Sequence, residues 1–263
     1  MKKTLFRSAV ASRVGRISRL SLAVAASAWL AACGDGGGSI WLDRASLQGR
    51  WTTVAEAAQP YTVIVVPSAS SNSTSDAWAL RQDGKALAQL FIDSNGSSSG
   101  TLFSFTGAAP VQISGGVDLN HAVTPKTLAL PGLAAGSTTF KLENNLVGTA
   151  ALADAAGTWE GQYDTDGDNQ MDRTVTLTVT ATGAIVNGSD SSTGCDYIGT
   201  LATVNAVKAY RVVFSEECKN DTLVAAYTGV ATVNPDKTRL TVVAVANDRT
   251  KPIAFLLSKT LAN

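Results

Sequence analysis

The sequence predicts an all-β protein: two tandem small antiparallel units, each a β-barrel or a β-sandwich, after an N-terminal signal peptide. Three observations predict this class: apolar and polar residues alternate in short segments, turn-forming residues separate these segments, and a Gly-x-Trp tripeptide occurs twice. The clearest alternation is Thr174–Thr180, where Val and Leu would point to one face and threonine to the other. This pattern is typical of an antiparallel strand with one solvated face.

Further β-rich segments follow one another along the chain after the signal. Turn signals such as Asp83-Gly84, Asn187-Gly188 and Asn234-Pro235 separate them. Short strands at a spacing of about 8–12 residues predict an antiparallel sandwich or barrel. Segment 107–136 is rich in Gly and Pro and predicts long loops with only brief strands. The other expected strands are Tyr61–Val66, Leu87–Ile92, Thr101–Phe105, Tyr210–Phe214, Leu223–Val233, Thr238–Val245 and Ile253–Leu257.

Two tripeptides, Gly49–Trp51 and Gly157–Trp159, open the two β-rich halves and lie 108 positions apart. Gly-x-Trp in the first strand resembles the opening of lipocalins and related up-and-down barrels, in which the tryptophan closes one end of the barrel. The resemblance implies a basic residue on the last strand, and Lys141 and Lys259 are the candidates. The alternative is that both tryptophans are core anchors of two small β domains that are unrelated to lipocalins.

The first 32 residues contain six basic residues, no acidic residue and an apolar stretch, Leu20–Leu30, as secretory signals do. This stretch is short for a membrane-spanning helix, which needs roughly 20 apolar residues. The segment ends on Leu30–Cys33, which resembles the end of a bacterial lipoprotein signal. The resemblance implies cleavage before Cys33, diacylglycerol on its sulfur and usually acylation of its new α-amino group, with palmitate as an acyl chain. An ordinary signal with a chance cysteine is the alternative.

The predicted organisation is a signal peptide over 1–32, a lipidated flexible tether over 33–46, a first β unit over 47–145 and a second over 146–263. Gly34 directly after the lipid cysteine favours the outer membrane, with the folded part facing the periplasm, by the same resemblance. The whole chain has 21 basic and 21 acidic residues, and removing the signal takes away six basic residues, so the mature chain has a net charge of −6. This charge argues against nucleic-acid binding, which needs clustered Lys and Arg.

Two cysteines, Cys195 and Cys218, remain once Cys33 carries the lipid. In an oxidising periplasm, two remaining cysteines most simply form a disulfide bond. A metal pair is the rival, but two thiolates alone rarely make a zinc site and no histidine lies near them in the sequence.

An acidic segment after Tyr163 is the candidate metal site. Its aspartates have the alternate spacing with which an EF-hand loop supplies calcium ligands. Asn169 stands where that loop has glycine, and Val175 where it has glutamate, so we expect weak calcium binding. A solvated hairpin loop is the alternative. The candidate ligands are Asp164, Asp166, Asp168 and Asp172.

Residue patterns that would indicate catalysis are few. His121 is the single histidine, and the chain has no Gly-x-Ser-x-Gly elbow, zinc spacing, phosphate loop or dinucleotide fingerprint. We therefore expect no enzyme activity, and a non-catalytic binding or interaction role at the cell envelope with a protein partner or an apolar small ligand. The alternatives are a lipocalin-type carrier of a small hydrophobic ligand and an envelope hydrolase with paired carboxylates.

Overall fold

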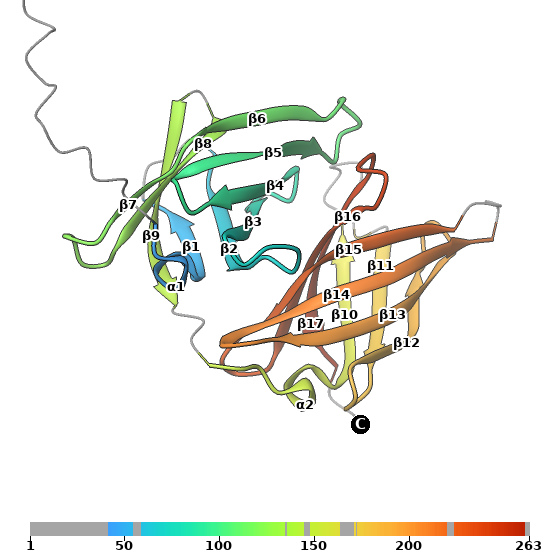
Figure 1. Cartoon of the computed structure of the whole chain (residues 1–263). Helices are drawn as coiled ribbons and strands as arrows, with labels where there is room; N and C mark the ends of the chain where they lie inside the picture. Colours follow the sequence, from blue (N-terminus) through green and yellow to red (C-terminus); the bar gives the residue numbers. More distant parts are fainter. Residues whose placement is uncertain are drawn as a thin grey trace, which may run out of the picture. The chain divides into compact units, whose positions relative to one another are not determined.

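Two antiparallel sheets that curl into barrels make up most of the chain in the computed structural model, which describes residues 42–54, 59–134, 136–144, 148–163, 171, 173–219 and 224–260. Residues 49–144 supply the first sheet, drawn from blue to yellow-green in Figure 1, and residues 157–259 supply the second, drawn from yellow to red. Both sheets belong to one compact unit, Ser39–Asn263. The predicted all-β class with two tandem barrel units is confirmed.

The first sheet contains nine strands. They are β1 (Gly49–Thr53), β2 (Tyr61–Pro67), β3 (Thr74–Arg81), β4 (Ala86–Asp93), β5 (Ser97–Ser104), β6 (Val111–Gly116), β7 (Asp118–Asn120), β8 (Thr127–Ala134) and β9 (Gly136–Asn144). Their order in the sheet is β6-β5-β4-β3-β2-β1-β9-β8-β7. The sheet curls until β6 lies beside β8, where Gly115 packs so close to Pro131 that a Cβ at Gly115 would lie 2.7 Å from the proline Cβ.

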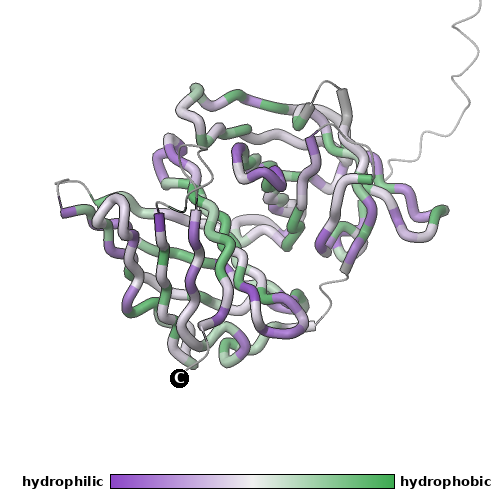
Figure 2. The backbone as a smooth tube through the Cα atoms, turned by 180° about the vertical axis from the view of Figure 1, so that it is seen from behind, coloured by the Kyte–Doolittle hydropathy of each residue, from purple (hydrophilic) through white to green (hydrophobic). Residues whose placement is uncertain are grey.

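The second sheet is a closed barrel of eight strands. They are β10 (Gly157–Tyr163), β11 (Arg173–Val179), β12 (Ala184–Asp190), β13 (Cys195–Val204), β14 (Val207–Cys218), β15 (Ala225–Val233), β16 (Arg239–Ala246) and β17 (Pro252–Lys259). Each strand pairs with the next, and β10 pairs with β17 through Trp159 and Lys259. The alternation in β11 is as predicted, because Val175, Leu177 and Val179 are buried and the threonines between them are half-buried. Figure 2 shows hydrophilic and hydrophobic residues alternating along strands of this barrel.

Both barrels have packed interiors. In the first, Trp51, Tyr61 and Phe140 are fully buried among aliphatic side chains of the surrounding strands. In the second, Phe214 stacks on Tyr227 with 5.1 Å between ring centres, and two further aromatic rings, of Tyr197 and Phe255, pack beside Phe214. Side chains of this size fill the interior of an eight-stranded barrel.

The predicted repeat is also a structural repeat. A one-turn helix precedes each Gly-x-Trp: α1 (Arg44–Leu47) and α2 (Leu152–Ala155). Each tryptophan is fully buried, and its indole N–H donates a hydrogen bond to the last carbonyl of its helix, from Trp51 to Leu47 (2.9 Å) and from Trp159 to Ala155 (2.8 Å). Each helix-and-tryptophan pair thus anchors the first strand of its barrel in the same way.

Segment 107–136 differs from its prediction, because β8 is a full strand there and not a loop. The chain contains Pro131 and Gly132 within β8, and the ladder to β9 shifts register between Pro131 and Ala134. Gly132 takes a positive φ of 75° at this irregularity. A bulge lets a strand contain proline and glycine, and a pattern of turn residues does not distinguish it from a loop.

Candidate functional site

The structure settles one of the predicted sites and leaves two outside its described residues. Cys195 and Cys218 are directly opposite each other on β13 and β14 and are joined by a disulfide bond, as predicted. The lipid cysteine and the four candidate calcium ligands lie outside the described residues, so both remain predictions: Cys33, Asp164, Asp166, Asp168 and Asp172.

The two basic residues of the lipocalin-like pattern have different environments. Lys259, on the last strand, places its Nζ 5.1 Å from the centre of the Trp159 ring, which is a cation–π distance. A Cβ at Gly157 would lie 2.7 Å from Lys259 Cε, so the glycine makes room for this lysine. In the first barrel, Lys141 is exposed and pairs with Thr52 in the ladder. His121 is exposed between β7 and β8.

Close to the disulfide, a buried polar network lies at one end of the second barrel. Asp190 accepts a bidentate contact from Arg173, with Nη2 at 2.7 Å and Nε at 2.8 Å from its Oδ2. Its other oxygen accepts the backbone N–H and the hydroxyl of Ser192, at 3.0 and 2.9 Å. Tyr227 donates its hydroxyl to Glu216 at 2.9 Å. Every contact here joins groups of the same barrel.

Charge states in this network follow from burial and pairing. Burial alone would raise the pKa of Asp190, but the Arg173 charge and the Ser192 hydrogen bonds outweigh it and hold this pKa below the ordinary value. Burial, reinforced by the Glu216 charge, raises the pKa of the hydroxyls of Tyr197 and Tyr227. A salt-bridged carboxylate with protonated tyrosines is a stabilising arrangement that orders the end of the barrel.

Several strands are buried on both faces, and their outer faces join the two barrels. In β2, the side chains of Tyr61, Val63 and Val65 pack inside the first barrel. Those of Ile64 and Val66 are buried on the opposite face. We call the cluster on that face the junction cluster. It consists of Ile64, Val66, Trp78, Leu80, Leu87 and Phe103 from the first barrel and Val204, Val207, Ala209, Val230, Val243 and Val245 from the second.

This junction is not among the features predicted from the sequence, although a signal for it is present there. A strand with one solvated face alternates, whereas a strand covered on both faces has a continuous apolar run. Such runs are Val63–Val66, Ala77–Leu80 and Val242–Ala246. Their apolar residues exceed what a single barrel interior can bury, and this excess is typical of strands with a second packing surface.

Polar contacts flank the junction cluster. Arg211 of β14 lies with its Nη1 3.5 Å from Asp76 Oδ2 of β3, and its Nη2 donates to the carbonyl of Pro67. Burial raises the pKa of Asp76 despite the nearby Arg211 charge. Arg249 stacks over the ring of Phe91, 5.4 Å from its centre. The two barrels are therefore held by an apolar contact with charged groups around it.

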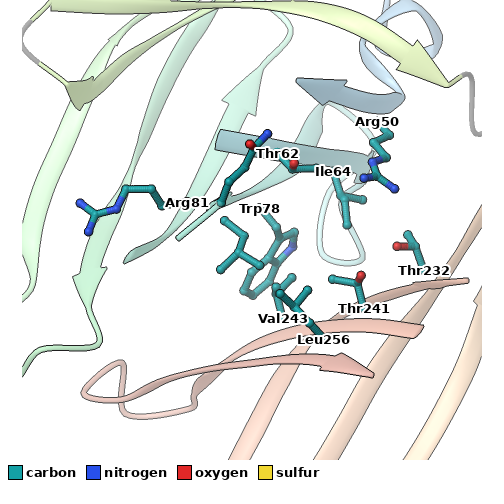
Figure 3. A pocket seen from close by; sticks show the side chains of 11 residues that line it. Arg50, Thr62, Ile64, Trp78, Arg81, Thr232, Thr241, Val243 and Leu256 are labelled. Carbon is teal, nitrogen blue, oxygen red and sulfur yellow. The ribbon is translucent and has the colours of Figure 1, made fainter. Parts of the chain in front are cut away.

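A groove of about 250 Å³ opens beside the junction cluster. Figure 3 shows its apolar wall, in which Trp78 and Ile64 of the first barrel face Val243 and Leu256 of the second. Thr232 and Thr241 add hydroxyl groups on the side of the second barrel. The remaining residues that line the groove are Arg50, Thr62, Leu80, Arg81 and Gln82.

The polar groups of the groove include an unpartnered donor and a cation, beside the hydroxyl groups of three threonines and the amide of Gln82. Trp78 is buried, with only 3 % of its surface exposed, and its indole Nε1 has no hydrogen-bond partner. In Figure 3 this nitrogen lies on the edge of the indole ring that is directed toward Ile64 and Thr241. Arg50 directs its guanidinium toward the groove, with Nε 3.2 Å from Glu143 Oε2, whereas Arg81 points away and pairs with Asp83. Within the part of the chain that the structure describes, none of the residues that line the groove is acidic.

An exposed apolar patch lies on the outer face of the second barrel. Ile198 of β13 and Val213 of β14 are 53 % and 50 % exposed, and the register makes them diagonal neighbours. Val186 on the adjoining strand β12 is 44 % exposed. We call these three residues the β12–β14 patch. An exposed cluster of large apolar side chains is typical of a protein-interaction surface.

Comparisons with known proteins give no further guide to either surface. No protein-family model, no curated protein and no solved structure matches this chain. Within the described residues, no helix is long and apolar enough to cross a membrane.

Proposed function

We propose that this chain is a lipid-anchored protein of the bacterial cell envelope with a non-catalytic binding role, and that it binds on the outside of its barrels. The observation that carries this proposal is the packing of both interiors. Aromatic side chains such as Trp51, Phe140, Phe214 and Tyr227 occupy the space in which a lipocalin-type carrier holds its ligand. The outer surface offers the groove at the junction and the β12–β14 patch instead.

The proposed location is the outer membrane, with the barrels in the periplasm. The lipoprotein-like ending at Cys33 supports the anchor, and the segment between it and the first described residue, Leu42, has the glycine-rich composition of a flexible tether. The disulfide between Cys195 and Cys218 supports an oxidising compartment, because such bonds persist outside the cytoplasm. Two or three acyl chains would hold the protein stably, whereas a single chain binds membranes only marginally.

Metabolic labelling tests the anchor. In cells grown with radiolabelled palmitate, the wild-type chain is expected to take up label and to fractionate with the outer membrane. Cys33→Ser removes the acceptor sulfur and is expected to take up none. Cys195→Ala with Cys218→Ala is the matched control, because it removes two cysteines and leaves the lipid acceptor in place. Label in Cys33→Ser, or its absence from wild type, would contradict the anchor.

Crosslinking in intact envelopes tests the binding role. We expect the wild-type chain to capture a specific protein at the β12–β14 patch, since burial of this patch removes exposed apolar surface from water. A double variant, Ile198→Lys with Val213→Lys, is expected to lose that partner while keeping its fold, because both positions face outward. Ser258→Lys on β17 is the control for added charge on another exposed strand position. Equal capture by the double variant would exclude this surface.

A further inference from the structure

We infer that the groove at the junction of the barrels is a binding site for a small amphipathic carboxylate, a molecule with one anionic end and a short apolar body. This inference rests on the proposed binding function and names the class of small ligand for it. Three observations support it independently: an unpartnered buried donor, a cationic lining, and a small apolar volume.

The unpartnered donor is the indole N–H of Trp78. Its side chain is 97 % buried, and Nε1 has no hydrogen-bond partner. Both other tryptophans in the described residues, Trp51 and Trp159, donate to backbone carbonyls. A buried donor without a partner carries a desolvation penalty, so a ligand that supplies an acceptor here would offset that penalty. A tryptophan N–H donates only, and the ligand atom must therefore accept.

The charge of the residues that line the groove determines which charge the accepting group of the ligand should carry. Among the described residues that line the groove, Arg50 and Arg81 carry a charge, and Arg50 alone directs its guanidinium into the groove, because Arg81 points away and pairs with Asp83. Arg50 forms an ion pair with Glu143, with Nε 3.2 Å from Oε2 but without a hydrogen bond at this nitrogen, and its terminal nitrogens face the groove in Figure 3. Guanidinium groups bind carboxylates through paired hydrogen bonds, which are stronger than neutral ones. An anionic ligand is favoured over a neutral one, and a cationic ligand is disfavoured.

The volume of the groove limits the size of the ligand, and its apolar lining favours an apolar body. About 250 Å³ lies just below the usual range for small-molecule pockets, roughly 300–1,000 Å³, so the ligand is small. At roughly 30 Å³ for each water in the liquid, the groove corresponds to about eight waters, which suits a body of about ten non-hydrogen atoms. Ile64, Leu80, Val243 and Leu256 would contact the apolar part.

Octanoate is the probe for this test, and 1-octanol is its neutral counterpart. The protein is the mature chain, residues 33–263, with Cys33→Ser so that no detergent is needed. Calorimetry is expected to show octanoate binding, with 1-octanol weaker by about tenfold, a typical consequence of losing one charged hydrogen-bonded contact. In ¹H–¹⁵N spectra, the indole N–H signal that Trp78→Phe removes is expected to shift on saturation with octanoate.

Variants locate the site. Arg50→Gln is expected to weaken octanoate binding about tenfold, and Thr241→Leu to abolish it by narrowing the groove without removing either donor. Arg239→Gln, which removes an exposed cation from the same strand as Thr241 but outside the groove, is the matched control and is expected to bind as wild type. Circular dichroism confirms that each variant is folded.

Three outcomes would overturn the inference: no octanoate binding at millimolar concentration, equal affinity in wild type and Arg50→Gln, or an unshifted Trp78 indole signal at saturation. Each of these leaves the capture experiment on Ile198 and Val213 untouched. Failure of the ligand site and failure of the proposed protein-binding role are therefore distinguishable.

Discussion

Replacing Asp190 by Asn is the sharpest test of how the second barrel is held together. The carboxylate is fully buried and receives two nitrogens of Arg173, whose side chain is 27 % exposed. Asn has the same shape but a single oxygen. If that oxygen accepts the Ser192 hydrogen bonds, the NH₂ group replaces Oδ2 and presents donors to Arg173, so the change removes the charge and the acceptor for Arg173. Arg173 would then lie beside a neutral amide.

The magnitude follows from the exposure of the two partners. Removing one partner of a fully buried ion pair costs roughly 3–5 kcal/mol. Arg173 reaches solvent, and water can rehydrate its guanidinium, which reduces the cost. We expect a loss of about 2 kcal/mol for Asp190→Asn, which corresponds to roughly a 30-fold increase in the population of open molecules.

Hydrogen exchange read by mass spectrometry localises this effect. At pH 7, peptides from β11, β12 and β13 of Asp190→Asn are expected to exchange about 30-fold faster than wild type. Peptides from β2 to β4 in the first barrel are expected to exchange as before. Asp196→Asn, an exposed carboxylate on β13, is the matched control and is expected to change nothing. Unchanged exchange in Asp190→Asn would refute the reasoning.

The pH dependence of the same variant follows from linkage. The folded-state pKa of Asp190 is lowered from its ordinary value of 3.8, so its stabilisation is present above pH 3.8 and is lost as the pH falls through the lower folded value. Wild type and Asp190→Asn are therefore expected to differ in melting temperature at pH 7 and to converge as the pH falls through the lowered pKa of Asp190. A difference that persists undiminished at low pH would show that the charge is not the cause.

Three further predictions concern the repeat, the disulfide and the acidic segment. Trp159→Phe and Trp51→Phe are each expected to cost about 2–3 kcal/mol in chemical denaturation of their own barrel, because each leaves a buried carbonyl without its indole donor; a cost below about 1 kcal/mol would contradict the anchor role. Cys195→Ala with Cys218→Ala is expected to lose about 3 kcal/mol, since the bond spans 23 positions, and reduction of wild type is expected to reproduce this loss. We propose that millimolar calcium raises the melting temperature of wild type and that Asp166→Ala abolishes the rise. An unchanged melting temperature of wild type in calcium would contradict the predicted calcium site.

Much of the fold could be predicted from local patterns. Alternation in Thr174–Thr180 predicts a strand with one buried face, and that strand is β11. The two Gly-x-Trp tripeptides predict two units with equivalent openings, and the structure repeats both the helix and the indole hydrogen bond. Cys195 and Cys218 are the two cysteines left after Cys33, so each has a single possible disulfide partner. The strand and repeat predictions succeed because the interactions that determine them are local in sequence.

The binding surfaces could not be predicted in this way, because they depend on which outer faces meet. Alternation shows which residues share a face of a strand, but not what covers that face. Trp78 lies in β3, which is not among the strands expected from the sequence. Only the packing of β3 against the second barrel buries its ring beside the groove and leaves its N–H without a hydrogen-bond partner. Arg211 and Asp76 are 135 positions apart, and no periodicity relates them.

The strand-rich class, the tandem repeat and the disulfide follow from local sequence features, because side-chain period and turn chemistry act over short distances and the cysteine count allows a single pairing. The tertiary structure alone decided that the barrels are filled and that their outer faces join. It also placed Arg50 and Trp78, from different strands, along one groove. Packing of large side chains is a cooperative property of the whole sheet, and it cannot be assigned until all the strands are in register.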